Sequence, residues 1–418
     1  MNLIKTSVLN GIAVLIKTAT MFILNKILAV YVGPAGYAAI GQFQNFIQMV
    51  TSFAGGAINT AVIKYTAEYY EDENKQRTVW KTAGSIVSIF SFIFTFLVLI
   101  FHQQLSLYIF KTVEYGSVFI WFAVFLIFFN LNALLLAILN GKKEILKLVI
   151  ANIAGSLFSL LVTSIMAVKY SLYGALVALS IYQSLNFMVT LFLCYRSNWF
   201  NWTYFYGKID ANIAKRFLAF ASMALVSAIC VPLSQMVIRS YLGHEYSVVY
   251  AGYWEAMIRL SAAYLMLVTT TLGVYYLPRL SELSNIQDIK KEIYLGYKLI
   301  FPLAVVGGVI VYMLKDWIIQ LLFSAQFLPM RELFLWQMIG DSLKVGSWIL
   351  AYLMLSKAMT RLFISTEIIF AFSSIFLTYL CTQIFGFEGV SIAHLLNYAL
   401  YWLVMSYCVF KNLNGVKL

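Results

Sequence analysis

Charged residues are scarce in this chain. They make up only 11% of its 418 residues, while 62% are hydrophobic. A soluble globular domain carries about 25% charged residues, so the shortage excludes one. Twelve membrane-spanning helices of about 22 residues would use about 264 positions, close to the whole apolar content. Too little polar sequence remains for a folded domain outside the membrane. This excludes a receptor ectodomain, a fused enzyme and a nucleic-acid-binding module, despite the net charge of +12.

Recognisable sites for metals, disulfides and enzyme chemistry are also missing from the sequence. The four cysteines stand singly within or at the ends of apolar runs, with no spacing that predicts a disulfide or a zinc site. The sequence contains no HExxH, GxSxG or GxGxxG motif and no Walker loop. We therefore expect no enzyme activity, no bound metal and no cofactor.

Long apolar runs dominate what is present. Twelve of them are long enough to span a bilayer: 8–32, 38–62, 82–101, 117–140, 148–168, 174–194, 217–238, 253–277, 299–314, 335–355, 362–383 and 389–410. An even number places both termini on one side. If that side is the cytoplasm, the tails and cytoplasmic loops carry 20 Lys and Arg, and the opposite loops carry five: Lys111, Lys169, Arg239, Lys315 and Arg331. Cytoplasmic loops are normally the basic ones, so we expect both termini in the cytoplasm.

The two halves of the chain correspond at one constant offset in residue number, which we call the repeat offset. It places Lys64 on Arg279, Lys142 on Lys357 and Gly174 on Gly389. This correspondence predicts a parallel repeat, an arrangement in which transport substrates bind between the halves. We expect an all-α polytopic membrane protein with twelve transmembrane helices in two pseudo-symmetric six-helix bundles around a central cavity. The expected domains are an N-terminal bundle at 1–195, a cytoplasmic linker at 196–216 and a C-terminal bundle at 217–418.

Seven charged residues remain inside the predicted spans. The bases are Lys17, Lys26, Arg259 and Lys344, and the acids are Glu255, Asp341 and Glu367. A charge that faces lipid at the bilayer centre costs about 2.5–3.5 kcal/mol on insertion scales, so each should face a cavity or a partner. Lys17 and Lys344 lie deepest and on polar helix faces, which predicts that they line a cavity. Lys26 and Glu367 lie near an interface, where they either snorkel or contribute to function.

Two spans carry further polar faces. In the second span, Asn45, Gln48 and Asn59 share one side of a helix with Ser52 and Gly55. In the tenth, Gln337, Asp341, Lys344 and Trp348 follow one another at i, i+4, i+7 and i+11. Amide and aromatic groups suit sugars, so the candidate sugar contacts are Asn45, Gln48, Asn59, Gln337 and Trp348. Helix packing through small and amide residues explains the stripe of the second span equally well.

Three further features each allow two interpretations. Glu255 and Arg259, four residues apart on one helix, either form an internal ion pair or contact substrate. His394 is either a satisfied buried imidazole or a group that titrates in a proton-coupled cycle. The candidates for ion coupling or ion pairing are thus Glu255, Asp341, Glu367 and His394. Pro232 should kink the seventh span, as a fixed bend or as a hinge.

Four segments spread over both halves carry a family resemblance. They are VGPAG at 32–36, YLPRLS at 276–281, RELFLWQMIGDSLKVG at 331–346 and LSKA at 355–358. Together they resemble the corresponding stretches of enterobacterial O-antigen and lipid III flippases. The resemblance implies membership of the multidrug/oligosaccharidyl-lipid/polysaccharide exporter superfamily, with two six-helix bundles. It also implies a substrate: undecaprenyl-pyrophosphate-linked O-antigen repeat units, moved from the cytoplasmic to the periplasmic leaflet of the bacterial inner membrane. It carries over no catalytic residue.

The intramembrane residues suit that substrate. Pyrophosphate requires fixed cations, and the candidates are Lys17, Arg259 and Lys344. We expect an alternating-access flippase of lipopolysaccharide biosynthesis. Its expected partners are the lipid-linked oligosaccharide, the bilayer, an O-antigen polymerase and a chain-length regulator, with no nucleic acid. Two alternatives stay open. A drug/cation antiporter of the same superfamily would need an acidic cavity, and a membrane glycan polymerase would need a larger outer loop than the short segment at 315–334.

Overall fold

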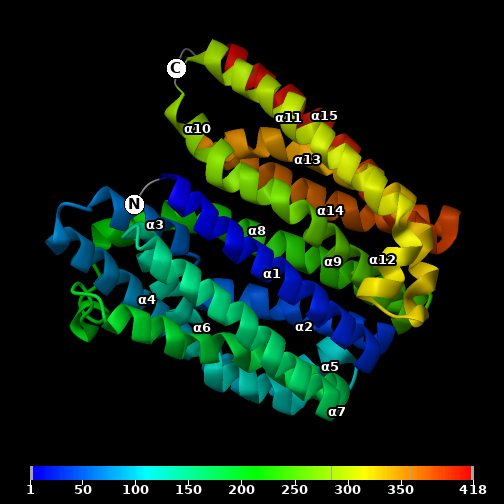
Figure 1. The fold of residues 1–418 in the computed structure, drawn as a ribbon, viewed down its shortest axis with the longest axis horizontal. Coiled ribbons are helices and arrows are strands. Elements are labelled where there is room, and N and C mark those ends of the chain that lie inside the picture. Colours follow the sequence, from blue (N-terminus) through cyan, green and yellow to red (C-terminus); the bar gives the residue numbers. More distant parts are fainter. Residues whose placement is uncertain (1–2, 284, 358, 416–418) are drawn as a thin grey trace. The chain divides into compact units, whose positions relative to one another are not determined.

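The computed structural model describes residues 3–283, 285–357 and 359–415, and the chain in these ranges is helical with no strand (Figure 1). The long helices are α1 (Leu3–Tyr31), α2 (Gly33–Ala54), α4 (Glu73–Ile100), α6 (Gly116–Gly141), α7 (Ile145–Tyr195), α8 (Ala211–Glu245), α9 (Val248–Thr271), α11 (Ile286–Met313), α13 (Phe334–Ser356), α14 (Thr360–Phe385) and α15 (Gly389–Gly415). The shorter α-helices are α3 (Asn59–Glu68), α5 (His102–Phe110), α10 (Leu277–Glu282) and α12 (Lys315–Leu322). A π-helix, η2 (Leu272–Tyr276), and three 3₁₀ segments, η1 (Trp202–Tyr204), η3 (Ala325–Leu333) and η4 (Gly386–Glu388), complete the chain.

Each of the twelve predicted apolar runs falls mainly on helical chain, as expected for a multi-pass membrane protein, although the run 38–62 is interrupted between α2 and α3. By length and composition, eight helical segments of the described chain can cross a membrane, or nine if the bent pair α2–α3 is one span. Two of the eight, Ile145–Tyr195 and Thr360–Lys411, have 51 and 52 residues. At 1.5 Å per residue a straight helix of that length would measure about 76 Å, more than twice the bilayer core, but each segment is broken near its middle. The number of twelve crossings stays a prediction.

The breaks inside these two long segments have the same geometry. Ser171 has φ 48° and ψ −130°, and Gly386, which corresponds to it at the repeat offset, has φ 65° and ψ −150°. Three residues beyond each break, the chain passes the preceding helix very closely. A Cβ atom would lie 2.0 Å from a carbonyl oxygen at Gly174 and 2.3 Å from one at Gly389. Those oxygens belong to Met166 and Cys381, which again correspond at the repeat offset.

A second pair of turns repeats in the same way. Glu144 precedes α7 with φ −80° and ψ 60°, and Met359 precedes α14 with φ −74° and ψ 59°. The backbone N–H of Glu144 donates to the carbonyl of Leu139 at 3.0 Å, and that of Met359 to Met354 at 2.9 Å. Agreement at two separate turns shows that the halves repeat residue for residue at the predicted offset.

The second helix of the first half is interrupted. It ends at Ala54 and resumes at Asn59 with a bend of 45°, because Gly56 and Ala57 have φ of 65° and 49° and so cannot continue a right-handed helix. The predicted polar stripe that joined Asn45 to Asn59 on one helix face is therefore wrong. At the corresponding place in the second half, the chain forms the π-helix η2.

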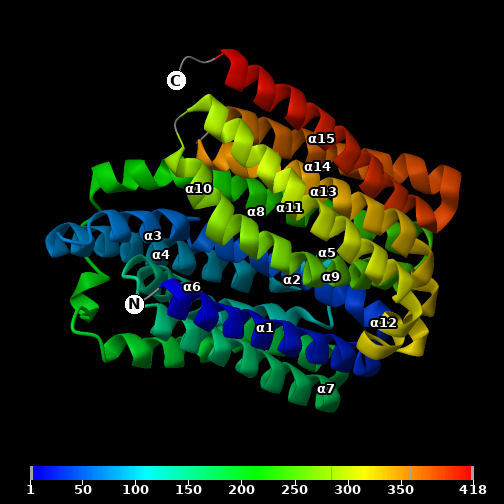
Figure 2. The ribbon, with the colours of Figure 1, turned by 45° about the horizontal axis from the view of Figure 1, so that its top comes forward.

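The chain divides into two compact units, which we call unit 1 (Met1–Pro232) and unit 2 (Leu233–Leu418). In unit 1, α6 packs against α3, α4, α5 and α7. In unit 2, α13 packs against α9, α10, α11, α14 and α15, and Figures 1 and 2 both show α11, α13, α14 and α15 side by side. Because α6 and α13 correspond at the repeat offset, they occupy equivalent central places in their units.

The segment between α7 and α8, predicted as a linker, packs within unit 1. The Trp199 indole donates to Glu144, and its ring centroid lies 5.3 Å from that of Trp80. Ser85 Oγ donates to the carbonyl of Gly207 at 3.0 Å. The division between the compact units lies farther along the chain, directly after Pro232 within α8.

Candidate functional site

Three charged residues of unit 2 form a largely buried cluster. Glu255 of α9 is 4% exposed. Its Oε1 accepts from Nε of Arg259, one turn later, at 2.7 Å, and its Oε2 accepts from Nη1 of Arg239 in α8 at 2.6 Å. The predicted pair of Glu255 with Arg259 is therefore present as part of a trio. Two guanidinium groups share one carboxylate, so the trio carries a formal charge of +1.

The sequence assigned Arg239 to an outer loop, and the structure corrects this. Arg239 is 2% exposed and lies within α8, which continues to Glu245, beyond the apolar run that ends at 238. Hydropathy ends this span too early because it scores the buried Arg239 as a polar loop residue. With Arg239 inside, the predicted spans hold five bases and three acids.

A second cluster in unit 2 surrounds Asp341, whose side chain is fully buried. Asp341 Oδ2 accepts from the Tyr264 hydroxyl at 2.9 Å, and its Oδ1 accepts from Gln337 Nε2 at 3.2 Å. His394 Nε2 lies 3.0 Å from the same Oδ1 and 3.1 Å from Gln337 Nε2. When Nε2 carries a proton it donates to Asp341, and without one it accepts from Gln337. Helices α9, α13 and α15 thus meet through polar side chains.

Lys344 lies between two aromatic rings. Its Nζ is 5.1 Å from the ring centroid of Trp348 on α13 and 5.1 Å from that of Tyr398 on α15. Cations are attracted to the faces of aromatic rings, more strongly where water is scarce. Lys344 follows Asp341 by three residues, so the predicted polar face of α13 carries an acid network at one level and a caged ammonium at the next. Trp348, a predicted sugar contact, forms one wall of that cage.

The predicted site residues of unit 1 make separate contacts and do not form one cluster. Asn45 Nδ2 donates to the carbonyl of Pro232 in α8 at 3.2 Å. Gln48 is exposed and its own backbone carbonyl accepts from Ser52 Oγ at 2.7 Å. Pro232 lies inside α8 and removes one helical donor there. The Asn45 contact thus joins α2 to the predicted hinge, whose role stays a prediction.

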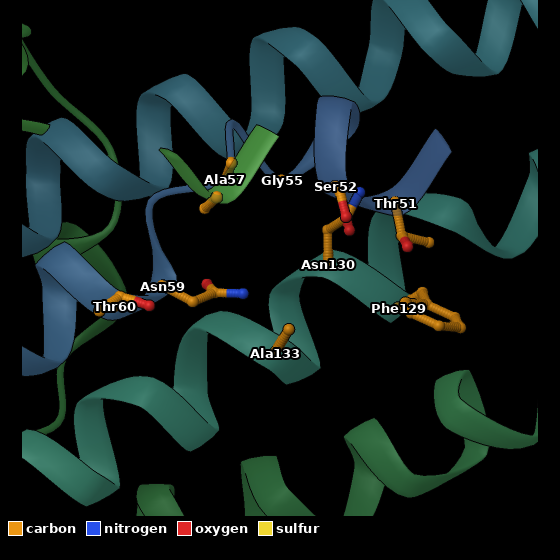
Figure 3. A pocket seen from close by; sticks show the side chains of 10 residues that line it. Thr51, Ser52, Gly55, Ala57, Asn59, Thr60, Phe129, Asn130 and Ala133 are labelled. Atoms are coloured by element: carbon orange, nitrogen blue, oxygen red, sulfur yellow. The ribbon is translucent and has the colours of Figure 1, made fainter. Parts of the chain in front are cut away.

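Asn59 lines a cavity of about 300 Å³ in unit 1, at the break between α2 and α3 (Figure 3). The lining residues with polar side chains are Thr51, Ser52, Asn59, Thr60 and Asn130. The other lining residues are Gly55, Ala57, Phe129, Ala133 and Ala224. Figure 3 shows Asn59 extending from the start of α3 into the open space beside Ala133 of α6. Asn130 is 3% exposed, and its Nδ2 donates to Ser91 Oγ at 2.9 Å.

The other charged candidates lie outside these clusters. Lys17 of α1 is exposed, Lys26 of the same helix is half-buried, and Glu367 of α14 is half-buried. The described residues hold no group of three His, Cys, Asp or Glu side chains placed to bind a metal ion. The cysteines Cys194, Cys230, Cys381 and Cys408 are all free thiols.

Sequence reasoning missed several residues of these sites. Tyr398 follows His394 by four residues on α15, a spacing that places both on one face and signals a shared environment. Asn130 is an isolated amide in an apolar run of α6, which is itself a signal of a buried polar contact. Tyr264 lies near the middle of the predicted span 253–277, away from the interfaces where membrane tyrosines gather, and that position is itself a signal of a buried polar contact.

Comparison with known proteins places the chain in a family. A family model described as "Polysaccharide biosynthesis protein" matches residues 3–284. The chain belongs to this family. It is 28% identical over 403 residues to the lipid III flippases of Escherichia coli strain K12 and of Shigella flexneri, covering 96% of this chain and 97% of each relative. The resemblance inferred from the four sequence segments is therefore confirmed.

Solved structures show the same fold across the superfamily. An inward-facing multidrug resistance MATE transporter of the MOP superfamily matches with a TM-score of 0.76, at 14% identity, over 96% of both chains. The lipid II flippase MurJ, in an inward closed conformation, matches with a TM-score of 0.74 at 14% identity, over 98% of this chain and 89% of MurJ. This chain thus has the fold of MOP-superfamily transporters, as predicted.

Proposed function

We propose that this chain is a flippase for lipid-linked oligosaccharides. More specifically, we propose that it translocates undecaprenyl-pyrophosphate-linked O-antigen repeat units from the cytoplasmic to the periplasmic leaflet of the inner membrane, as a step of lipopolysaccharide biosynthesis. The lipid III flippases that match over 96% of the chain support the substrate class. The MOP-superfamily fold supports a transporter, and we infer alternating access between unit 1 and unit 2.

The observation that carries the proposal is the excess of one cation over acids among the clustered charged side chains of unit 2, Asp341 included. Lys344 is held between Trp348 and Tyr398, and the trio of Arg239, Glu255 and Arg259 has one base more than acid. A pyrophosphate that leaves water needs fixed positive groups, because an unpaired charge in a low-dielectric environment costs several kcal/mol. Aromatic rings attract the Lys344 ammonium without neutralising it, so its charge stays available to an anionic ligand.

The same charges argue against the alternatives. A cation antiporter would need an acidic interior, whereas the five bases and three acids of the predicted spans sum to +2. A glycan polymerase would need a sizeable outer loop, but the predicted outer segment is largely taken up by α12 and η3. If transport is coupled to protons, His394 and Asp341 are the groups that would respond, because the hydrogen bond of His394 Nε2 changes with its protonation.

Replacing Lys344 by Ala in a strain that lacks the flippase gene tests the proposal. We expect surface O-antigen to fall about tenfold or more, the effect of losing roughly 1.4 kcal/mol of substrate stabilisation, at equal protein level. Single undecaprenyl-linked units should accumulate on the cytoplasmic face, as measured by their protection from a periplasmic probe. Lys315→Ala is the matched control, because Lys315 also lies over a ring, that of Tyr312, but outside unit 2's buried clusters.

Two results would contradict this proposal. Full complementation by the Lys344→Ala protein at low expression would remove Lys344 from the mechanism. Lipid-linked units found on the periplasmic face of the deletion strain would instead indicate a polymerase.

A further inference from the structure

The internal repeat places different chemistry on equivalent faces of the two central helices. At the repeat offset, Lys344 of α13 corresponds to Phe129 of α6, and Trp348 corresponds to Ala133. Phe129 and Ala133 line the cavity of unit 1. The face that holds a caged cation in unit 2 is thus neutral in unit 1, where a small residue replaces the tryptophan and leaves open space.

The cavity of unit 1 is large enough for one sugar residue. Its volume is about 300 Å³, many times what a single water molecule needs. It therefore has room for a group of the size of a hexose, which has six carbons and six oxygens. A single chloride or sodium ion would leave most of the space unfilled.

The lining selects an uncharged ligand with several hydroxyl groups. None of the described residues that line the cavity is ionisable, and five of them offer a hydroxyl or an amide. An ion that entered without a counter-charge would lose its hydration with no compensation. The partly apolar wall of Phe129, Ala133 and Ala224 suits the C–H face of a pyranose ring, which is apolar while its rim is polar.

Two groups at the break between α2 and α3 await a hydrogen-bond partner. The Asn59 amide extends into the cavity, and among the described residues it makes no hydrogen bond (Figure 3). Ile58 precedes α3 and offers no side-chain cap, so the first N–H groups of that helix have no acceptor within it. The left-handed residues Gly56 and Ala57 interrupt the helix beside the cavity, which Ala57 itself lines.

We propose that this cavity binds one uncharged sugar residue of the lipid-linked glycan and so sets which repeat unit the protein accepts. Asn59 would donate to a sugar hydroxyl, and Ala133 would leave the space the ring needs. This inference rests on the proposed function. It adds a division of labour, in which unit 2 binds the pyrophosphate that all such lipids share and unit 1 reads the glycan that differs among them.

Lipid binding by the purified full chain in detergent tests whether unit 1 and unit 2 recognise different parts of the substrate. The probes are bare undecaprenyl pyrophosphate and the lipid-linked repeat units extracted from a strain that lacks the flippase gene. Ala133→Leu fills the cavity, Asn59→Ala removes its central amide, and Val124→Leu enlarges an exposed position of the same helix as a control. We expect Ala133→Leu and Asn59→Ala to weaken binding of the repeat-unit lipid about tenfold while binding of bare undecaprenyl pyrophosphate stays within about twofold. Val124→Leu should change neither.

The possible results distinguish a failure of this inference from a failure of the proposed function. If Ala133→Leu and Asn59→Ala bind both lipids as the wild type does, or weaken both equally, the cavity does not read the sugar. Lys344→Ala should weaken both lipids in parallel. If Lys344→Ala weakens neither, the proposed phosphate site fails, whatever the cavity variants show. A monodisperse elution profile for each variant ensures that a loss of binding is not a loss of fold.

Discussion

Glu255 holds two arginines, so the three residues of the trio are not equally important for stability. Glu255→Gln removes the carboxylate that both the buried Arg239 and the partly buried Arg259 contact. Arg239→Gln leaves the neutral pair of Glu255 with Arg259, whose 2.7 Å contact is local to α9. Breaking a buried pair by removing one partner costs about 3–5 kcal/mol. We expect Glu255→Gln to lower the unfolding temperature in detergent by clearly more than Arg239→Gln does.

The exposed Glu332 provides the control for this comparison, since Glu332→Gln makes the same chemical change outside the buried clusters. Equal unfolding temperatures for Glu255→Gln and Arg239→Gln would show that Glu255 does not balance both arginines.

At the scale of single residues, sequence predicts contacts within one helix better than contacts between helices. The spacing of four residues was enough to pair Glu255 with Arg259. Arg239 lies 16 residues before Glu255, on the preceding helix α8. The sequence around it does not indicate which face of the end of α8 is covered by other helices. The same limit explains Tyr264, which reaches Asp341 from 77 residues away.

The turn inside α7 and the turn between α14 and α15 have similar backbone geometry but different residues at the position with positive φ. That residue decides how strained each turn is. Both turns have positive φ with strongly negative ψ, a region that is comfortable only for glycine. The first turn uses Ser171 and the second uses Gly386. Strain of this kind costs about 1–3 kcal/mol, and the greater freedom of glycine in the unfolded chain offsets part of it.

The two exchanges should therefore have opposite effects. We expect Ser171→Gly to raise the free energy of unfolding by about 1 kcal/mol and Gly386→Ser to lower it by about 1–2 kcal/mol. Thermal unfolding of both purified variants measures this. If Ser171→Gly destabilises the protein as Gly386→Ser does, the serine side chain has a favourable role at the turn that outweighs the strain of its backbone.

At the scale of helices, apolar length predicted where they lie but not where they break. All twelve runs fall mainly on helical chain, because a bilayer demands both apolar side chains and internally satisfied backbone groups. The break between α2 and α3 was missed, although Gly55 and Gly56 mark it, since hydropathy averages over a glycine pair. That omission also hid the cavity, because the cavity exists only where the helix is interrupted.

At the scale of the whole molecule, the repeat was predictable from its glycines and basic residues, whereas the chemical difference between the units was not. Turn geometry survives at the repeat offset because close backbone approaches tolerate only glycine, as at Gly174 and Gly389. Buried polar side chains follow no such rule. Asp341 corresponds to Leu126 and His394 to Leu179, so the polar network of unit 2 has an apolar counterpart in unit 1. A repeated scaffold with unequal faces suits a ligand that has one anionic and one neutral part.

The predicted orientation of the chain in the membrane depends on the same residues. Since Arg239 is buried within α8, the predicted outer loops keep only four of the five bases assigned to them, and the predicted cytoplasmic segments keep 20. This strengthens the charge bias on which the prediction of cytoplasmic termini rests. A green fluorescent protein fused to the C-terminus should therefore fluoresce. Alkaline phosphatase inserted at the turn near Ser171 should be active, because that enzyme needs the oxidising periplasm to form its disulfides. Activity of the phosphatase at the C-terminus, with none at the turn, would invert the topology. The phosphates of a cytoplasmic lipid would then enter from the opposite end of each unit.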